Sequence, residues 1–350
     1  MSGIGRASFV GLLAAVQTFA GGCKSSGDRP PPQPQDDATP YPPVLRTDFP
    51  DPFILEHEGQ YLAYATNSGG ANVQMALSSN LTSWRPIMEE RGPTRLYDAM
   101  PALPTWAKAG FTWAPEVLKT QDGFVLYFTA RHTATGLQCV GAATSQSPRG
   151  PFTSQATEPL VCQFDLGGTI DASPFRAPDG QLYLYYKNDG NHPSFNKPAE
   201  IFAQRLSPDG LSLTGEPVSL VRNDKPWEGG VVEAPTMVEQ DGAYVLFFSG
   251  NYYGWEGAGD LSPYGIGYAT CEGPMGPCTD APNNPFFAST SEPCISGPGH
   301  QTVFQTGGKE VFAFHAWAAT SDCSSANQGR YLHLAQLSWR SGVPQLSPLE

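Results

Sequence analysis

Residues 170–186 read IDASPFRAPDGQLYLYY, and this stretch contains the pattern that decides the fold. The pair Asp179-Gly180 separates two runs of strand-forming residues, which predicts a tight β-hairpin. The same layout, an extended start followed by a turn glycine and an aromatic strand, occurs in five copies along the chain. The turn glycines are Gly59, Gly123, Gly180, Gly242 and Gly308, which lie 64, 57, 62 and 66 residues apart.

Each copy continues into a further strand of small and apolar residues, as in residues 139–143 and 265–269. Three or four antiparallel strands repeated five times predict an all-β protein with the fold of a five-bladed β-propeller. An array of β-sandwiches is the alternative, but it would not require such regular spacing. Charged residues make up only 15% of the chain, and no segment has a sustained helical period, so long amphipathic helices are not expected.

The chain is acidic, with a formal net charge of -13 over its 350 residues. A strongly negative protein repels polyanions, so nucleic acids are not expected as partners. The charge suits a neutral or a cationic substrate.

The N-terminal segment resembles an export signal. Arg6 precedes an apolar run at residues 7–20, which is too short for a comfortable membrane span. Small residues before Cys23 resemble a bacterial lipoprotein signal, in which this cysteine would be lipidated, although Ala20 stands where that motif usually has leucine. An ordinary signal peptide that is cleaved nearby is the alternative.

Three regions are therefore expected: a signal peptide of lipoprotein type at residues 1–22, a Pro-rich linker at 23–45 and the propeller at 46–350. The protein is expected to be exported, and either secreted or lipid-anchored at the bacterial cell envelope. A lipid on Cys23 would be its contact with the membrane.

Six cysteines follow Cys23, and an even number favours disulfide bonds in an exported chain. Six cysteines allow 15 pairings, and the sequence alone does not choose among them. A metal site is the alternative, but the chain has no Cys-x-x-Cys pair. The pairing that proximity favours is Cys139–Cys162, Cys271–Cys278 and Cys294–Cys323.

Three of the five copies carry a carboxylate eight or nine residues before the turn glycine, namely Asp51, Asp171 and Glu233. In a propeller the first strand of each blade lines the central channel, so these acids are expected to converge at one mouth. A single acid close before a proline is usually a turn residue. The joint placement in three copies instead favours a shared site.

Converging carboxylates are the working parts of most glycosidases. One carboxylate stays ionised and activates water, while the other is kept protonated and donates to the leaving oxygen. These roles require the environment to separate the two pKa values, and a third acid nearby can raise the pKa of the proton donor by like-charge repulsion. The three acids therefore predict hydrolysis of a glycosidic bond.

Five segments resemble those of glycoside hydrolase family 43, which contains β-xylosidases, α-L-arabinofuranosidases and arabinanases on a five-bladed propeller. They are DPFI at 51–54, WAPEV at 113–117, IDASPF at 170–175, VEAP at 232–235 and GPGH at 297–300. The resemblance covers roughly residues 46–345. It implies an inverting single displacement with Asp51 as general base and Glu233 as general acid. In this resemblance Asp171 tunes the pKa of Glu233 and orients it.

The resemblance also implies two positions beside the acids. His300 resembles the family's central-channel histidine, often associated with a bound calcium through water, whereas a hydrogen-bonded core histidine is the alternative. Arg330 resembles an arginine that contacts the sugar, whereas a surface arginine is the alternative. No cofactor is expected for the chemistry itself.

Three further residues are candidate substrate contacts. Trp113 is expected either to stack on a sugar ring or to pack at the channel wall. Glu116 stands near the expected mouth as a water or sugar contact. Asn188 is expected either to line the mouth or to belong to a polar turn.

The expected substrate is a plant cell-wall polysaccharide or oligosaccharide that contains arabinose or xylose. Residues 186–191 and 297–300 resemble arabinan- and arabinofuranoside-active members of the family more than β-xylosidases. A β-xylosidase of the same family and a non-catalytic carbohydrate-binding propeller are the alternatives. A propeller enzyme that acts on fructosides is disfavoured, because residues 46–53 lack the start of blade one that those enzymes usually have.

Overall fold

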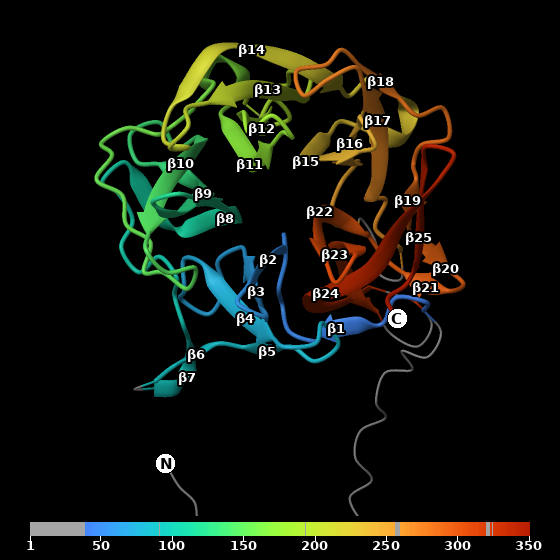
Figure 1. Cartoon of the computed structure of the whole chain (residues 1–350), viewed down its shortest axis with the longest axis horizontal. Coiled ribbons are helices and arrows are strands. Elements are labelled where there is room, and N and C mark those ends of the chain that lie inside the picture. The colour runs from blue at the N-terminus through green and yellow to red at the C-terminus, as the bar shows by residue number, and fades with distance from the viewer. Residues whose placement is uncertain (1–38, 91, 193, 256–259, 320–322, 324) are drawn as a thin grey trace, which may run out of the picture. The chain divides into compact units, whose positions relative to one another are not determined.

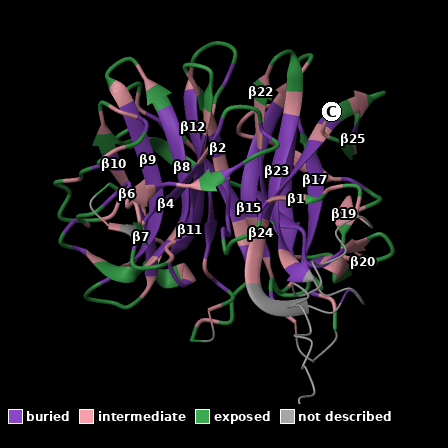
Figure 2. Ribbon diagram, turned by 90° about the horizontal axis from the view of Figure 1, so that it is seen from below, coloured by how far each residue is buried: buried purple, intermediate pink, exposed green. Residues whose placement is uncertain are grey.

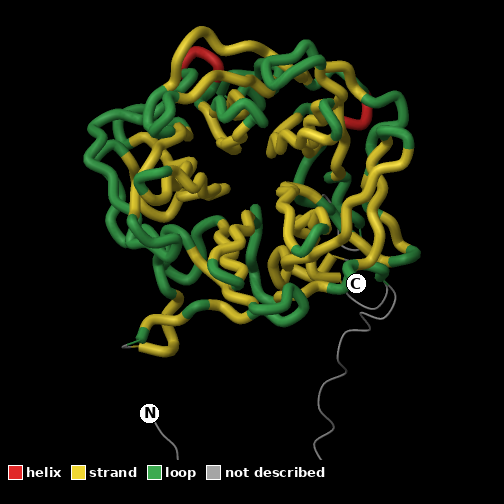
Figure 3. Tube along the Cα trace, viewed as in Figure 1, coloured by secondary structure: helices red, strands yellow, loops and turns green. Residues whose placement is uncertain are grey.

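The computed structural model describes residues 39–90, 92–192, 194–255, 260–319, 323 and 325–350. The expected signal peptide, Cys23 and most of the expected linker lie outside these residues. Within the described ranges the regular structure is strands with two short 3-10 helices, η2 (Phe164–Leu166) and η3 (Pro226–Glu228) (Figure 3). None of the helices in these ranges is long and apolar enough to span a membrane.

Five antiparallel sheets stand around a central axis, and this arrangement confirms the predicted five-bladed propeller (Figure 1). The first blade consists of β2 (Phe53–His57), β3 (Gln60–Ala65), β4 (Gln74–Ser78) and β5 (Arg85–Pro86), and the second of β8 (Ala107–Thr120), β9 (Gly123–His132) and β10 (Gln138–Ser145). The third consists of β11 (Thr169–Arg176), β12 (Leu182–Asn188), β13 (Glu200–Leu206) and β14 (Leu213–Arg222). The fourth consists of β15 (Val232–Gln240), β16 (Ala243–Gly250), β17 (Gly265–Cys271), β18 (Cys278–Asp280) and β19 (Phe287–Ala288).

The fifth blade joins the two ends of the described chain. It consists of β22 (Gly299–Thr306), β23 (Lys309–Ala319), β24 (Ser325–Arg340), β25 (Val343–Pro348) and β1 (Pro43–Leu45). Both β1 and β25 pair with β24, so a strand from the start of the chain completes the last blade and closes the ring. Two short hairpins lie outside the blades, β6 (Met88–Glu89) with β7 (Gly92–Leu96) and β20 (Thr290–Ser291) with β21 (Cys294–Ile295).

This closure corrects the expected boundary between linker and domain. Residues 41–45 were expected to end the linker, but they belong to the folded domain. Leu45 is buried, and the ring of Tyr41 packs edge-on against Phe287 and Phe314. The apolar side chains within this Pro-rich segment explain the difference, because they cover a blade that would otherwise expose its outer strand.

The inner strands β2, β8, β11, β15 and β22 contact one another in a closed ring. The expected hairpin turns connect these strands to the second strands. At Glu58-Gly59, Asp241-Gly242 and Gly307-Gly308 both turn residues have positive φ, which is the conformation of type I′ turns. At Asp179-Gly180, the pair from which the hairpin was predicted, and at Asp122-Gly123, only the glycine has positive φ, so these two turns are of another type.

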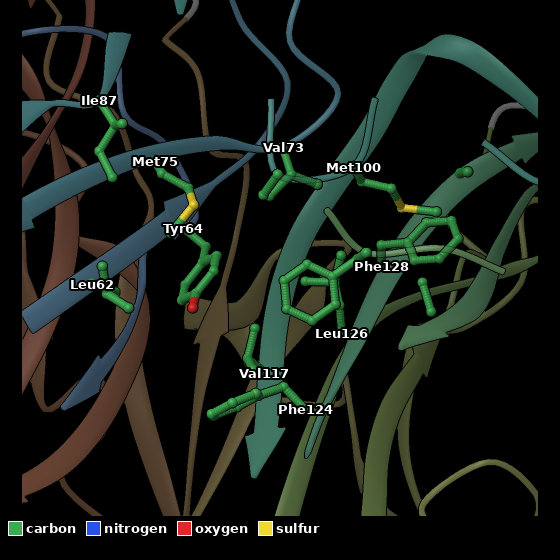
Figure 4. Packing of buried hydrophobic residues seen from close by; sticks show 14 of the residues in the cluster. Leu62, Tyr64, Val73, Met75, Ile87, Met100, Val117, Phe124, Leu126 and Phe128 are labelled. Carbon is green, nitrogen blue, oxygen red and sulfur yellow. The ribbon is translucent and has the colours of Figure 1, made fainter. Parts of the chain in front are cut away.

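The core lies between neighbouring blades. In one cluster Tyr64 and Met75 of the first blade face Leu126 and Phe128 of the second (Figure 4). Most strands are buried along their middle, except outer strands such as β14 and β25, whereas the connecting loops are mostly exposed (Figure 2). The apolar faces of the blades therefore hold the ring together and leave the loops free to build a site.

Three disulfides confirm the pairing that proximity favoured. They are Cys139–Cys162, Cys271–Cys278 and Cys294–Cys323. Each joins segments that follow one another closely in the chain, so the bonds fix local loops and leave the packing between blades to the apolar core.

Candidate active site

Every inner strand, or the two residues before it, contains one non-glycine residue with positive φ. These residues are Asp51, Ala114, Asp171, Ala234 and His300. In four blades the strand pairing shifts register at this point, which identifies a β-bulge. Non-glycine residues in this conformation are strained and cluster at functional sites. The five blades thus place one strained residue each at an equivalent position.

The bulges refine the sequence alignment of the three acids. Asp51 and Asp171 occupy the strained position itself, whereas Glu233 stands one residue before the strained residue Ala234. Counting residues back from the turn glycine missed this offset, because the length of the segment between bulge and turn differs by one residue among the blades.

A pocket of about 400 Å³ at one end of the channel brings the predicted catalytic residues together. Asp51, Asp171 and Glu233 all line it, and so do the predicted residues Trp113, His300 and Arg330. Residues from all five blades contribute to the wall. The predicted convergence of the three acids at one mouth is therefore what the fold produces.

Asp51 lies among positive and hydrogen-bonding groups. Arg330 Nη1, His300 Nδ1 and His315 Nδ1 lie 3.1, 3.4 and 3.4 Å from its Oδ1, and Thr66 donates a hydrogen bond to Oδ2. Burial by itself would raise the pKa of Asp51, but Arg330, the two histidines and the Thr66 hydroxyl outweigh burial and hold this pKa well below its usual range. Asp51 is therefore an ionised carboxylate.

Asp171 has the opposite environment, because no cation is paired directly with it among the described residues. Its Oδ2 accepts a hydrogen bond from the backbone N–H of Ala234, 3.0 Å away. Burial and the charge of Glu233 raise the pKa of Asp171 to about 6, against lowering by His300 and Lys187. Its proton is therefore exchanged in the pH range in which enzymes usually work.

Glu233 is held at both carboxyl oxygens. Lys187 Nζ lies 3.1 Å from Oε2, and the Tyr264 hydroxyl donates to Oε1 at 2.7 Å. Lys187 also lies 3.6 Å from Oδ1 of Asp189, which lines the pocket. The carboxyl group of Glu233 thus has a fixed orientation before any ligand arrives.

Aromatic side chains form part of the rim of the pocket. Tyr252 and Tyr253, between β16 and β17, line the pocket and are about half exposed. The guanidinium of Arg330 lies 5.3 Å from the ring centre of Tyr253 and 5.7 Å from that of Trp317. Exposed rings beside a polar pocket are the surface on which sugar rings stack.

Two predicted substrate contacts lie elsewhere. Glu116 is buried deeper in the channel and lines a separate pocket beside Ser173, because the strand carries it further along the channel than Trp113. Asn188 is buried, and its amide group bonds to the backbone of Leu166, Pro198 and Glu200. Both residues were expected near the sugar, and the structure brings neither of them into the pocket with the three acids.

Four residues of the site were not singled out from the sequence. Thr66, Lys187 and His315 come from second strands or their ends, and Tyr264 directly precedes β17. A comparison of the ends of the second strands would have found the first three, because Thr66, Thr129, Lys187, Ser249 and His315 occupy equivalent places. No sequence signal distinguishes Tyr264 from the many aromatic residues of the core.

The calcium expected near His300 finds no set of direct ligands. Across the part of the chain that the structure describes, no three His, Cys, Asp or Glu side chains are grouped to hold a metal ion. His300 Nδ1 instead faces the carboxylate of Asp51.

Comparisons with known proteins agree with this geometry. The chain matches the family model of Glycosyl hydrolases family 43 over residues 41–344. It is 28% identical to beta-D-galactofuranosidase xynD of Aspergillus niger, over 77% of this chain and 74% of that protein. It is also 30% identical over 195 residues to an arabinoxylan arabinofuranohydrolase of Bacillus subtilis, over 49% of this chain and 34% of that protein.

Solved structures show the same fold. A thermostable family-43 glycoside hydrolase superposes with a TM-score of 0.72 and 28% identity, over 87% of this chain and 95% of the other. An endo-1,4-beta-xylanase from Bacteroides thetaiotaomicron superposes with a TM-score of 0.70 and 26% identity, over 88% and 97%. The chain belongs to glycosyl hydrolase family 43 and is a glycoside hydrolase.

Proposed function

We propose that the protein hydrolyses α-L-arabinofuranosidic bonds of plant cell-wall polysaccharides, with inversion at the anomeric carbon. The observation that carries this proposal is the contrast between three carboxylates in one pocket. Asp51 is paired with Arg330 and stays ionised, whereas Asp171 takes up a proton near pH 6 beside Glu233. Such a separation of environments is what an acid and a base in one site require.

In the proposed reaction Asp51 is the general base. A water molecule attacks the anomeric carbon and gives its proton to Asp51 as the new C–O bond forms. An ionised carboxylate with a fixed orientation suits this step, and the contacts of Asp51 with Arg330 and Thr66 provide both properties.

Glu233 is the proposed general acid. As the glycosidic C–O bond breaks, the leaving oxygen takes the proton of Glu233. Glu233 loses one proton while Asp51 gains one from the water, so the net charge of the enzyme does not change in this step. Asp171 is proposed to tune this step by its negative charge, and its bond to the N–H of Ala234 fixes it beside the acid.

Arg330 and Trp113 are the proposed sugar contacts. Arg330 lines the pocket at the carboxylate of Asp51, so a hydroxyl group near the attacking water would lie within its reach. Trp113 lines the wall of the same pocket from blade two, and its indole ring is an apolar surface for a sugar ring. Glu116 and Asn188 are given no such role.

The preference for a furanoside rests on the names of similar proteins. The relatives in Aspergillus niger and Bacillus subtilis are named for galactofuranose and arabinofuranose substrates, which share the five-membered ring. A probable arabinan endo-1,5-alpha-L-arabinosidase A of Aspergillus flavus is 24% identical over 75% of this chain. The similar xylanase structure keeps a β-xyloside as the second candidate substrate.

The experiment is a comparison of three substrates: nitrophenyl α-L-arabinofuranoside, nitrophenyl β-D-xyloside and linear arabinan. Turnover of the arabinofuranoside and arabinan above the xyloside is expected. Sugar binding without turnover of any substrate would instead support a carbohydrate-binding propeller. NMR of the first product formed should show inverted configuration, and a retained configuration would exclude single displacement.

The proposed location is the outside of the cell or the cell envelope. Three disulfides in the folded domain agree with export, because such bonds persist in oxidising compartments. A lipid anchor on Cys23 is part of the proposal. Replacing Cys23 with Ser should release the protein from the membrane fraction, and unchanged membrane association would contradict the anchor.

A further inference from the structure

Lys187 breaks a regularity that the other four blades share. In each of those blades, a side chain at the end of the second strand accepts a hydrogen bond from the strained N–H of the next blade. The pairs are Thr66 with Ala114, Thr129 with Asp171, Ser249 with His300, and His315 with Asp51. The equivalent residue of the third blade is Lys187, which has no acceptor atom to offer.

In the third blade, the strained N–H of the next blade therefore needs another acceptor. The N–H of Ala234, which would need the missing acceptor, donates to the carboxyl group of Asp171. Lys187 does not bond to this N–H. Its ammonium nitrogen lies 3.1 Å from Oε2 of Glu233 instead. One substitution in the repeat thus supplies a cation to the proposed general acid and turns Asp171 towards the backbone beside it.

Lys187 is buried, so it needs acidic partners to keep its positive charge. The side chain is 1% exposed, and a lysine so deeply buried stays charged only when acids surround it. Burial lowers the pKa of Lys187, but Glu233, Asp189 and Asp171 outweigh burial and raise it above its usual value. Lys187 is therefore a permanent positive charge within the site.

We propose that Lys187 is a positioning residue, which orients Glu233 and sets the pH at which Glu233 exchanges its proton. This inference rests on the role proposed for Glu233. A general acid donates best when its pKa lies near the working pH. Asp171 and Asp189 place negative charge near Glu233, and the ammonium of Lys187 is the charge that opposes them at its carboxyl group.

The other charged groups near Glu233 do not replace Lys187. Asp171 on β11 and Asp189 after β12 are acids, and Tyr264 before β17 donates a neutral hydrogen bond. His300 on β22 and Arg330 on β24 face the carboxylate of Asp51. Among the described residues, Lys187 is the cation that forms an ion pair with Glu233.

The test compares Lys187→Met with Lys187→Arg. The methionine keeps an apolar stem of similar length without the charge, whereas the arginine keeps the charge. The substrate is an unactivated arabino-oligosaccharide, whose leaving group needs a proton. The loss of kcat/KM at high pH reports the general acid of the free enzyme. In Lys187→Met this loss should begin about 1 to 3 pH units higher, as expected for removal of an opposite charge at contact distance.

Two comparisons separate this effect from a structural one. Lys187→Arg should keep the high-pH limb close to that of the wild type, and an equal shift in both variants would overturn the inference. An aryl arabinofuranoside with a good leaving group needs little proton donation, so Lys187→Met should impair its hydrolysis less. Equal losses on both substrates would mean that Lys187 serves only to hold the site together.

A second measurement does not depend on activity. Carbon-13 NMR of protein labelled at the glutamate carboxyl groups, with Glu233→Gln to assign the signal, follows the titration of Glu233 directly. Its midpoint should rise in Lys187→Met, or in Lys187→Gln if the methionine variant does not fold. An unchanged midpoint would overturn the inference even in an active enzyme. An inactive wild type would refute the proposed function and leave this titration to decide on Lys187.

Discussion

Nη1 of Arg330 lies 3.1 Å from Oδ1 of Asp51, although 279 positions separate the two residues in the chain. The contact joins the last blade to the start of the first. The backbone reinforces it, because the N–H of Arg330 donates to Asp48 Oδ1 and the N–H of Phe49 donates to the Arg330 carbonyl. The charge that keeps Asp51 ionised is therefore available only when the ring of blades is closed.

Replacing Arg330 should move the low-pH limb of activity. A general base must be ionised, so activity is lost as pH falls through its pKa. Without Arg330 the pKa of Asp51 rises, and in Arg330→Ala the loss of kcat/KM should begin about one or more pH units higher than in the wild type. Arg330→Lys keeps a charge and should shift the limb less. Identical limbs in all three proteins would show that Arg330 does not control Asp51.

Replacing Asp51 should affect every substrate. Asp51→Asn keeps the shape of the side chain but removes the proton acceptor, so turnover should fall by about 10² to 10⁴-fold. The fall should be similar for an activated aryl arabinofuranoside and for arabinan, because both need an activated water. Glu58→Gln, at an exposed turn of the same blade, is the matched control and should leave turnover unchanged. A loss restricted to arabinan would assign Asp51 to binding rather than to water activation.

Replacing Glu233 should separate the two substrates. Glu233→Ala removes the proton donor, which arabinan needs and a good aryl leaving group does not. The rate on arabinan should therefore fall far more than the rate on the activated arabinofuranoside. Measured kcat values for both substrates decide the matter, and equal losses would count against Glu233 as the general acid.

The sequence predicted those parts of the fold that local chemistry determines. The five turn glycines mark the hairpins, and their spacing of about 60 residues predicted the blades. The disulfides followed from proximity in the chain. The end of the linker was placed wrongly because Tyr41 and Leu45 act through partners more than 200 residues away, which no local pattern shows.

The repeat pattern predicted the part of the site that the inner strands carry, and Arg330 on β24 was found only through the family resemblance. Asp51, Asp171 and Glu233 were found because all three stand at the start of a blade. Lys187 lies on the second strand of the third blade and Tyr264 just before the third strand of the fourth, and both reach Glu233 only in the folded protein. Side-chain direction was the other limit. Asn188 is adjacent to Lys187, so its side chain lies on the opposite face of the sheet. There it bonds to the backbone and does not face the pocket.

The disulfides should stabilise the fold according to the length of chain that each one closes. Cys139–Cys162 spans 23 residues and Cys271–Cys278 spans 7. The entropy of loop closure predicts that a double Cys→Ser change costs about 3.5 kcal/mol for the first pair and about 2.5 kcal/mol for the second. Urea unfolding of the two variants and the wild type measures both losses. A larger loss for the shorter loop would show that local packing, and not chain entropy, dominates.

The stability of the domain should also report the proton of Asp171. Its pKa is raised from 3.8 to about 6 in the folded protein, so the folded state holds this proton more tightly than the unfolded chain. The resulting stabilisation is complete below about pH 3.8 and is lost as pH rises through about 6. A pKa difference of this size corresponds to roughly 3 kcal/mol.

Asp171→Asn removes this contribution without a large change in shape. The free energy of unfolding of the wild type, minus that of the variant, should therefore fall by roughly 3 kcal/mol between about pH 3.5 and 7. Urea titrations at several pH values measure it. Asp122→Asn, at an exposed turn, is the control and should change the pH dependence little. A difference that rises with pH would mean that Asp171 is stabilised as a carboxylate in the folded protein, and Asp171 would then offer Glu233 a fixed negative charge across the whole range.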